Sequence, residues 1–423
     1  MSVDAEPTSP ARMRAPIAVV ALGIFVTGFG WPGIIGRIPF TLLLKNQLGL
    51  GADEVAAFWA VATIAWYCKP LVGLICDAFP LFGTRRRAYM LWGSLLSGVF
   101  WLAFAIVPRR YLPFMILMTA LNAAMVFVST SVGGLQVETG QRFGATGRLA
   151  SLRSAMEGCM YLFGGPIGGF LAARAFGWTA ATGALVMFAF VPVVVLLQRE
   201  PKTARANASV FKAAGAKLRA IVRSRPMLAT TGLVFLFFLA PGFQTPLLYY
   251  QQDVLKVDAA FMGLLQMLGG AGYLVGAAVY VALCRRLPLR VSLAIGIAVC
   301  GTGVLLYLRY DSPRAAAIIE ATYAVLYTLG SLPLYDLVAR ATPKGSESFG
   351  FGLTMSVQNV ALFAISDVVG SRLYSHYHVG FKSLVWINAL STLAVLLFLP
   401  LLPKTLLEAR EAARPGAGVA GAP

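Results

Sequence analysis

Charged residues are scarce in this chain of 423 residues. Asp, Glu, Lys and Arg together make up 12% of it, whereas hydrophobic residues make up 58%. An ordinary soluble domain carries about twice that share of charge, so the composition excludes that class. Histidine is rarer still: His376 and His378 are the only two, and no carboxylate or cysteine lies beside them in the sequence. We therefore expect no metal and no cofactor.

Three kinds of functional framework are also missing. The five cysteines all fall inside or at the ends of apolar runs, and their spacing suggests no disulfide or zinc framework. The sequence has no glycine-rich phosphate-binding loop, so direct use of ATP is not expected. It has no nucleophile, base or metal set with the spacing of a known enzyme class, and no sizeable soluble domain of the kind a receptor or scaffold carries. We expect a protein that is not an enzyme.

The net charge of +18 alone could indicate a nucleic-acid partner. The basic residues, however, lie between long apolar runs, which is the pattern of a membrane protein. We therefore expect the lipid bilayer as a partner and no nucleic acid.

Twelve apolar runs are long enough to cross a bilayer, whose core of about 30 Å needs roughly 20 residues. They lie near 16–44, 53–76, 87–107, 111–137, 148–173, 178–198, 227–250, 259–284, 287–308, 313–338, 348–372 and 382–402. The first is too long for a signal-peptide core, and Gly28–Gly33 should break it. The longest polar connection, 199–225, divides the runs six and six.

These runs predict an all-α polytopic membrane protein of twelve transmembrane helices in two pseudo-symmetric six-helix bundles, 16–198 and 226–402. The connection 199–225 is then a linker, and the polar ends, 1–15 and 403–423, are expected to be disordered. With the N-terminus inside, 23 of the 35 Lys and Arg residues fall on the cytoplasmic side. This excess predicts that both termini are cytoplasmic. We expect a monomer in the plasma (inner) membrane.

The sequence from Trp66 to Tyr89 joins the second run to the third. Three adjacent arginines, Arg85–Arg87, follow a turn that contains Pro80 and Gly83. Arginines at the bilayer centre are costly, so the cluster marks a cytoplasmic face. The alternative is that it serves only as a topology signal.

Gly73-x3-Asp77 followed by the basic cluster resembles the loop signature of the major facilitator superfamily. With Lys69-Pro70, Pro80-x2-Gly83 and the triple arginine, the longer pattern is similar to the folate–biopterin transporter family. The resemblance implies a secondary transporter that moves folate- or pterin-type solutes by alternating access. The alternative within the same fold is another organic solute, through muropeptide import or drug efflux.

The two halves of the sequence echo each other. Glu138-x3-Arg142 closes the fourth run and Asp336-x3-Arg340 closes the tenth, 198 residues later. The second half has no aspartate that matches Asp77. Glu138 is predicted to reach the Arg85–Arg87 cluster, and Asp336 to reach Arg285 or Arg286, although such pairs can also be simple surface pairs. The predicted cytoplasmic gate contains Lys69, Asp77, Arg85, Arg86, Arg87, Glu138, Arg142, Arg285, Arg286, Asp336 and Arg340.

Other polar groups at membrane depth are candidates for a transport site. The predicted substrate-binding residues are Arg37, Asn122, Arg153, Glu157, Gln244, Gln266, Tyr323, Tyr327, Gln358 and Asn359. Aromatic faces would stack on a planar heterocycle, amides would read its edges, and a guanidinium would bind a carboxylate.

Arg153 and Glu157 lie one turn apart and should pair, which could serve packing alone. Glu157, Glu320 and Asp367 are candidates for coupling transport to a proton. For Glu320 and Asp367 the alternative is solvation at the outer interface, and for Lys69 it is extension toward the cytoplasmic interface.

Overall fold

The computed structural model describes residues 10–142, 146–200, 215, 219, 223–284, 286–342 and 347–403. The predicted tails outside 10–403 and most of the predicted linker lie beyond these residues. In the first half, the helices are α1 (Pro10–Phe29), α2 (Arg37–Asn46), α3 (Ala52–Ala62), α4 (Ile64–Tyr67), α5 (Lys69–Ala78), α6 (Arg87–Ala103), α7 (Tyr111–Arg142), α8 (Thr146–Ala172) and α9 (Phe176–Leu197). Helix α1 begins at Pro10, within the segment that was expected to be disordered as far as residue 15.

In the second half, the helices are α11 (Arg225–Leu239), α12 (Gln244–Asp253), α13 (Ala259–Cys284), α14 (Leu289–Gly303), α15 (Pro313–Ala341), α16 (Glu347–Asn359), α17 (Asp367–Ser375) and α18 (Phe381–Ala394). Two 3₁₀ segments, η1 (Val304–Arg309) and η3 (Val395–Leu401), continue α14 and α18. A π-helical segment, η2 (Val360–Ser366), joins α16 to α17. The described residues form no named strand, in agreement with the predicted all-α class.

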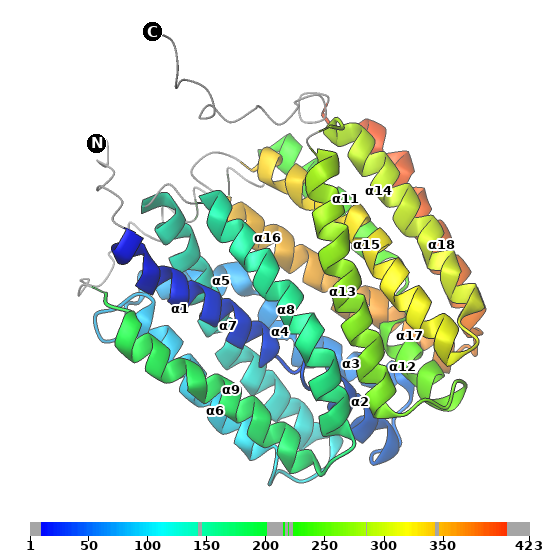
Figure 1. Cartoon of the computed structure of the whole chain (residues 1–423), viewed down its shortest axis with the longest axis horizontal. Helices are drawn as coiled ribbons and strands as arrows, with labels where there is room; N and C mark the ends of the chain where they lie inside the picture. Colours follow the sequence, from blue (N-terminus) through cyan, green and yellow to red (C-terminus); the bar gives the residue numbers. More distant parts are fainter. Residues whose placement is uncertain are drawn as a thin grey trace.

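The two halves of the chain form two groups of helices (Figure 1). The first half, blue to green, lies at the lower left of the view, and the second half, green to red, lies at the right. Within the described part of the chain, eight helices are long and apolar enough to cross a membrane. Four further segments, here called columns like the other crossings, are helix α6, helix α8, the broken pair α1–α2 and the broken triple α3–α5. The structure is therefore consistent with twelve crossings.

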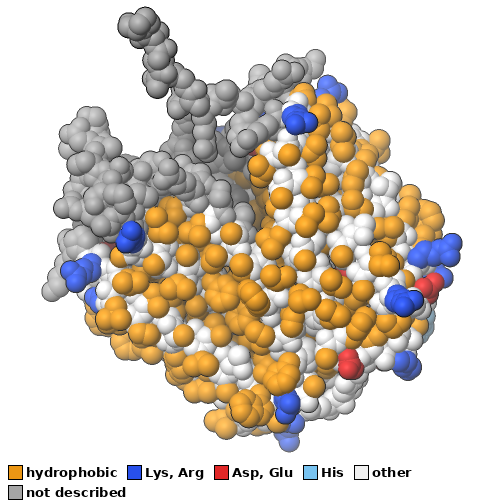
Figure 2. All heavy atoms as spheres, in the orientation of Figure 1, with side chains coloured by type: hydrophobic (Ala, Val, Ile, Leu, Met, Phe, Trp, Pro, Cys, Tyr) orange, Lys and Arg blue, Asp and Glu red, His pale blue; other side chains and the backbone are white. Residues whose placement is uncertain are grey.

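The outer surface suits a bilayer. Figure 2 shows hydrophobic side chains over most of one face, with Lys and Arg side chains mainly near its margins. Large exposed side chains such as Leu185, Ile116 and Leu397 are 68%, 59% and 77% exposed. Such a surface would be unstable in water, because contiguous apolar patches drive association.

Several columns are broken. The predicted break in the first column lies between α1 and α2, and the second half repeats it between α11 and α12, at Pro241-Gly242. Proline removes a backbone donor, which interrupts a helix. Gly242 compensates by donating its N–H to the Ser366 carbonyl at 2.9 Å. The breaks at Thr63 and Cys68 were not expected from the sequence.

Glycines bring the two halves close along α8 and α13. A Cβ atom at Gly165 would lie 2.5 Å from the Gly263 carbonyl oxygen, and one at Gly263 would lie 2.4 Å from the Gly165 oxygen. Small residues let membrane helices approach backbone to backbone. These contacts hold the halves together near the centre of the molecule.

Candidate functional site

Helices α2, α3, α12 and α17 meet at one end of the molecule, at the lower right of Figure 1. We call this the closed end. Arg37, at the start of α2, donates to Thr245 Oγ1 of α12 at 2.9 Å and lies 3.7 Å from Asp367 Oδ2 of α17. Asp367 also accepts from the Thr245 N–H at 3.0 Å and its hydroxyl at 2.7 Å. Because the Arg37 and Asp367 side chains are only 11% and 3% exposed, this ion pair is a buried link between the halves.

Further polar contacts join the halves at the closed end. The Tyr249 hydroxyl donates to the Leu50 carbonyl, and the Ala52 N–H donates to Ser375 Oγ at 3.0 Å. Lys45 of α2 pairs with Asp253 of α12. The hydrogen bonds and ion pairs found between the described parts of the two halves all lie here. This distribution indicates that the halves are locked together at this end.

The opposite end carries the Arg85–Arg87 cluster, and we call it the basic end. Arg86 Nη2 lies 2.6 Å from Glu138 Oε1, which confirms the predicted contact. Glu200 was not among the predicted gate residues. It accepts the backbone N–H groups of Arg85, Arg86 and Arg87 at 2.9, 3.1 and 2.9 Å. A carboxylate on free N–H groups at a helix start is favourable, so Glu200 fixes the start of α6.

Of the two predicted contacts of Asp336, the one with Arg286 is not formed. Asp336 accepts from Nε and Nη2 of Arg340, one turn along its own helix, at 3.1 and 2.8 Å, instead of from Arg286. An in-helix partner is favoured because it needs no loop to be ordered. Arg285 and the side chains of Asp77 and Arg142 lie outside the described residues.

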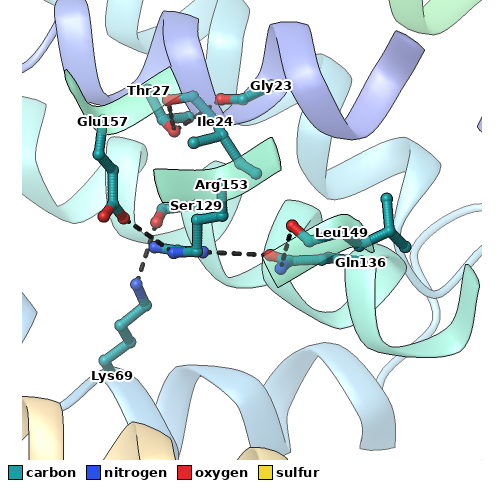
Figure 3. A network of polar contacts seen from close by, with 9 residues as sticks. All are labelled: Gly23, Ile24, Thr27, Lys69, Ser129, Gln136, Leu149, Arg153 and Glu157. Carbon is teal, nitrogen blue, oxygen red and sulfur yellow. Dashed lines mark hydrogen bonds and ion pairs between the residues drawn. The ribbon is translucent and has the colours of Figure 1, made fainter. Parts of the chain in front are cut away.

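A charged cluster lies between α5, α7 and α8 (Figure 3). Arg153 Nε donates to Glu157 Oε1 at 2.8 Å, which confirms the predicted pair, and Nη1 donates to Gln136 Oε1 at 3.3 Å. Lys69 Nζ donates to Ser129 Oγ at 3.1 Å. The Arg153 and Glu157 side chains are 33% and 31% exposed, so the pair is accessible rather than sealed in a core.

An aromatic wall adjoins this cluster. The indole N–H groups of Trp31 and Trp66 both donate to Asn122 Oδ1, at 3.0 and 2.8 Å. Trp31 also meets Phe363 of the π-helical segment edge-on, with ring centroids 5.9 Å apart. Lys69 Nζ lies 5.2 Å from the centroid of the Trp66 ring. Asn122 is fully buried and its amide donates to the Met118 carbonyl, so it orients the two indoles instead of facing a ligand.

Tyr161 lies one helical turn after Glu157 in α8. Its ring and that of Tyr273 in α13 lie 6.4 Å apart across the interface between the halves. In the second half, the Tyr335 hydroxyl donates to Gln358 Oε1 at 3.1 Å, so the predicted residue Gln358 has a tyrosine partner.

Glu320 lies in a separate cluster inside the second half. It accepts from the Tyr307 hydroxyl at 3.2 Å and from the Tyr310 hydroxyl at 2.9 Å. Tyr310 in turn accepts from Gln251 at 2.7 Å. Glu320 forms no ion pair with a described residue, so its carboxylate is held by neutral hydroxyls alone.

The other predicted substrate residues are dispersed. Tyr323 packs against Tyr307 and Tyr327, on the Glu320 side. Gln266 is on the α8–α13 interface beside Gly165, and Gln244 is exposed at the start of α12. Asn359 is the last residue of α16. Trp66 was not among the predicted site residues, although it is the first residue of the loop motif. No pattern in the sequence indicated Ser129, Tyr161, Thr245 or Tyr273.

Comparison with known proteins identifies the family. The BT1 family model matches residues 33–414. The folate-biopterin transporter of Synechocystis sp. is 29% identical over 401 residues, which cover 88% of this chain and 79% of that protein. Folate transporter 2 of Plasmodium falciparum is 22% identical over 350 residues, covering 75% of this chain and 72% of that protein.

Solved structures of the same fold belong to transporters of other solutes. A D-xylose–proton symporter superposes with a TM-score of 0.70 at 16% identity, covering 91% of this chain and 96% of its own. A POT family transporter in complex with 5-aminolevulinic acid gives 0.74 at 12% identity, covering 93% and 96%. The chain therefore belongs to the BT1 family and is a multi-pass membrane transporter with the major facilitator fold.

Proposed function

We propose that this chain is a secondary transporter of folate- or pterin-type solutes and works by alternating access. The observation that carries the proposal is the match to the BT1 family over most of the chain, together with relatives named as folate and folate-biopterin transporters. The solute would bind between the aromatic wall (Trp31, Trp66, Phe363) and the charged cluster (Lys69, Arg153, Glu157). A planar heterocycle gains from aromatic faces, and its edges need hydrogen-bonding partners.

The contacts between the halves support alternating access. At the closed end the Arg37–Asp367 pair links α2 to α17, whereas at the basic end the Arg86–Glu138 and Asp336–Arg340 pairs each lie within one half. We expect one of the two states of alternating access to have this asymmetry: polar links between the halves at one end and, among the described residues of the other end, ion pairs that stay within one half. The excess of basic residues supports a cytoplasmic position for the basic end and for both termini. The protein would be a monomer in the plasma (inner) membrane.

A proton is the proposed coupling ion, and Glu320 is the best-placed carrier of the three candidates. Asp367 and Glu157 are held by arginines, whereas the known partners of Glu320 are hydroxyls. Hydroxyl donors can serve a carboxylate, and a tyrosine oxygen can equally accept from a protonated one.

The test is uptake of radiolabelled folate and biopterin into proteoliposomes that contain the purified protein. We expect accumulation that a proton gradient drives and a protonophore abolishes, and that E320Q reduces to downhill exchange. If the wild type carries neither compound, the substrate proposal fails, and a muropeptide or a drug would be tested next. If uptake ignores both the gradient and the protonophore, proton coupling fails.

A further inference from the structure

The geometry points to Lys69 as the anchor for a substrate carboxylate, so that the site selects pterins with an anionic tail over uncharged ones. This inference rests on the proposed function and deepens it, because it assigns the charge of the substrate and the residue that recognises it.

Lys69 supplies the unbalanced charge of the cluster. Arg153 is directly bonded to Glu157 at 2.8 Å and to Gln136 at 3.3 Å, so its charge has a partner. Lys69 donates to Ser129, a neutral hydroxyl, at 3.1 Å. An ammonium group has three N–H donors, so donors remain for a ligand. The three charged side chains carry a net charge of +1, which an incoming carboxylate would neutralise.

The cluster is accessible, which a merely structural charge pair would not need to be. The Arg153 and Glu157 side chains are about one-third exposed, at 33% and 31%, and Lys69 is partly exposed. A lysine inside a membrane-spanning segment is energetically costly unless it has a function or a partner. Figure 3 shows its ammonium pointing from α5 toward the α7 and α8 side chains.

An aromatic surface lies where the neighbouring part of such a ligand would be. The Trp66 centroid is 5.2 Å from Lys69 Nζ, and Asn122 holds the Trp66 and Trp31 indoles in fixed orientations. In folate, the carboxylate-bearing glutamate is attached to a benzoyl ring, so a ring and a carboxylate are neighbours in the ligand too. The benzoyl ring would pack on Trp66 while the carboxylate meets Lys69.

The experiment compares folate with its dimethyl ester, which keeps the shape and removes both charges. Labelled folate is transported into proteoliposomes by the full-length protein, and the two unlabelled compounds compete with it. Wild type, K69Q, K69R and the control S129A are measured side by side. S129A removes the neutral partner of Lys69 but leaves the ammonium in place.

For the wild type, we expect the ester to compete on the order of tenfold to a hundredfold more weakly than folate, as losing a charged hydrogen bond implies. K69Q should weaken competition by unlabelled folate by a similar factor and change competition by the ester by less than about threefold. The two compounds should then compete about equally. K69R should recover part of the preference, and S129A should keep it.

Two results would overturn the inference alone. In one, the ester competes as well as folate against the wild type. In the other, K69Q weakens competition by both compounds equally, which would mean that Lys69 has a structural role. A wild type that carries biopterin but not folate also overturns it, while the proposed function stands. A wild type that carries neither compound removes the proposed function as well.

Discussion

Trp31 and Trp66, from two different broken columns, share one acceptor, the side-chain oxygen of the buried Asn122, at 3.0 and 2.8 Å. Both tryptophans lie at breaks: Trp31 follows α1, and Trp66 lies in the short α4 between the breaks at Thr63 and Cys68. Asn122 on α7 therefore ties two irregular segments to a continuous helix. This contact fixes the aromatic wall without using a substrate-facing group.

Replacing Asn122 by leucine should destabilise the protein, because two indole N–H groups lose their acceptor. A buried unsatisfied donor costs about 1–3 kcal/mol. W66F removes one donor together with its need for a partner, so it should cost less. Thermal unfolding of the purified variants and folate binding will compare them. If N122L is as stable as W66F, the shared acceptor is unimportant.

The buried pair Arg37–Asp367 should be sensitive to loss of one partner. R37M leaves the Asp367 carboxylate buried beside Thr245, and breaking such a pair costs about 3–5 kcal/mol. The double variant R37M/D367N leaves no buried charge and keeps an oxygen for the Thr245 donors, so it should unfold at a higher temperature than R37M. Calorimetry of R37M, D367N and the double variant gives a double-mutant cycle for this pair. Additive effects of the two substitutions would contradict a direct interaction.

Glu138 and Glu200, two of the carboxylates at the basic end, should differ in importance. Glu138 is 53% exposed, and exposed ion pairs contribute about 0–1 kcal/mol, so E138Q should change stability little. Glu200 accepts three backbone N–H groups, so E200A should expose the amides of residues 85–87. Hydrogen exchange measures those amides directly. Equal exchange in E138Q and E200A would show that Glu200 does not fix the start of α6.

Two glycines on the same helix provide a matched test of the contact between the halves. In G263A, the new methyl group would meet the Gly165 carbonyl at 2.4 Å, whereas at Gly269 a Cβ has nothing within 4 Å. Overpacking costs about 1–3 kcal/mol, so G263A should lower both the unfolding temperature and the transport rate. G269A should change neither. Similar behaviour of the two variants would argue against tight packing of α8 on α13.

Local sequence patterns predicted much of the architecture. The apolar runs and the Gly28–Gly33 break each depend on residues adjacent in the chain, as does the Arg153–Glu157 pair one helical turn apart. The contact between Glu138 and Arg86 was also predicted, because both halves repeat an acidic residue near the end of a run, opposite a loop with a basic cluster. Asp336 shows the limit of that reasoning. Among the described residues it pairs with Arg340 in the same helix, and loop position alone could not indicate this.

The sequence by itself determined that the chain crosses a membrane many times in two related halves. It did so because burial in lipid demands long apolar helices, and these are visible along the chain. Only the tertiary structure decided the other contacts between polar groups. Arg37 contacts Thr245 and Asp367, and Glu320 accepts hydrogen bonds from two tyrosines. Trp31 and Trp66 both donate to Asn122. These partners lie up to several hundred residues apart, and each contact depends on how the helices are placed around it.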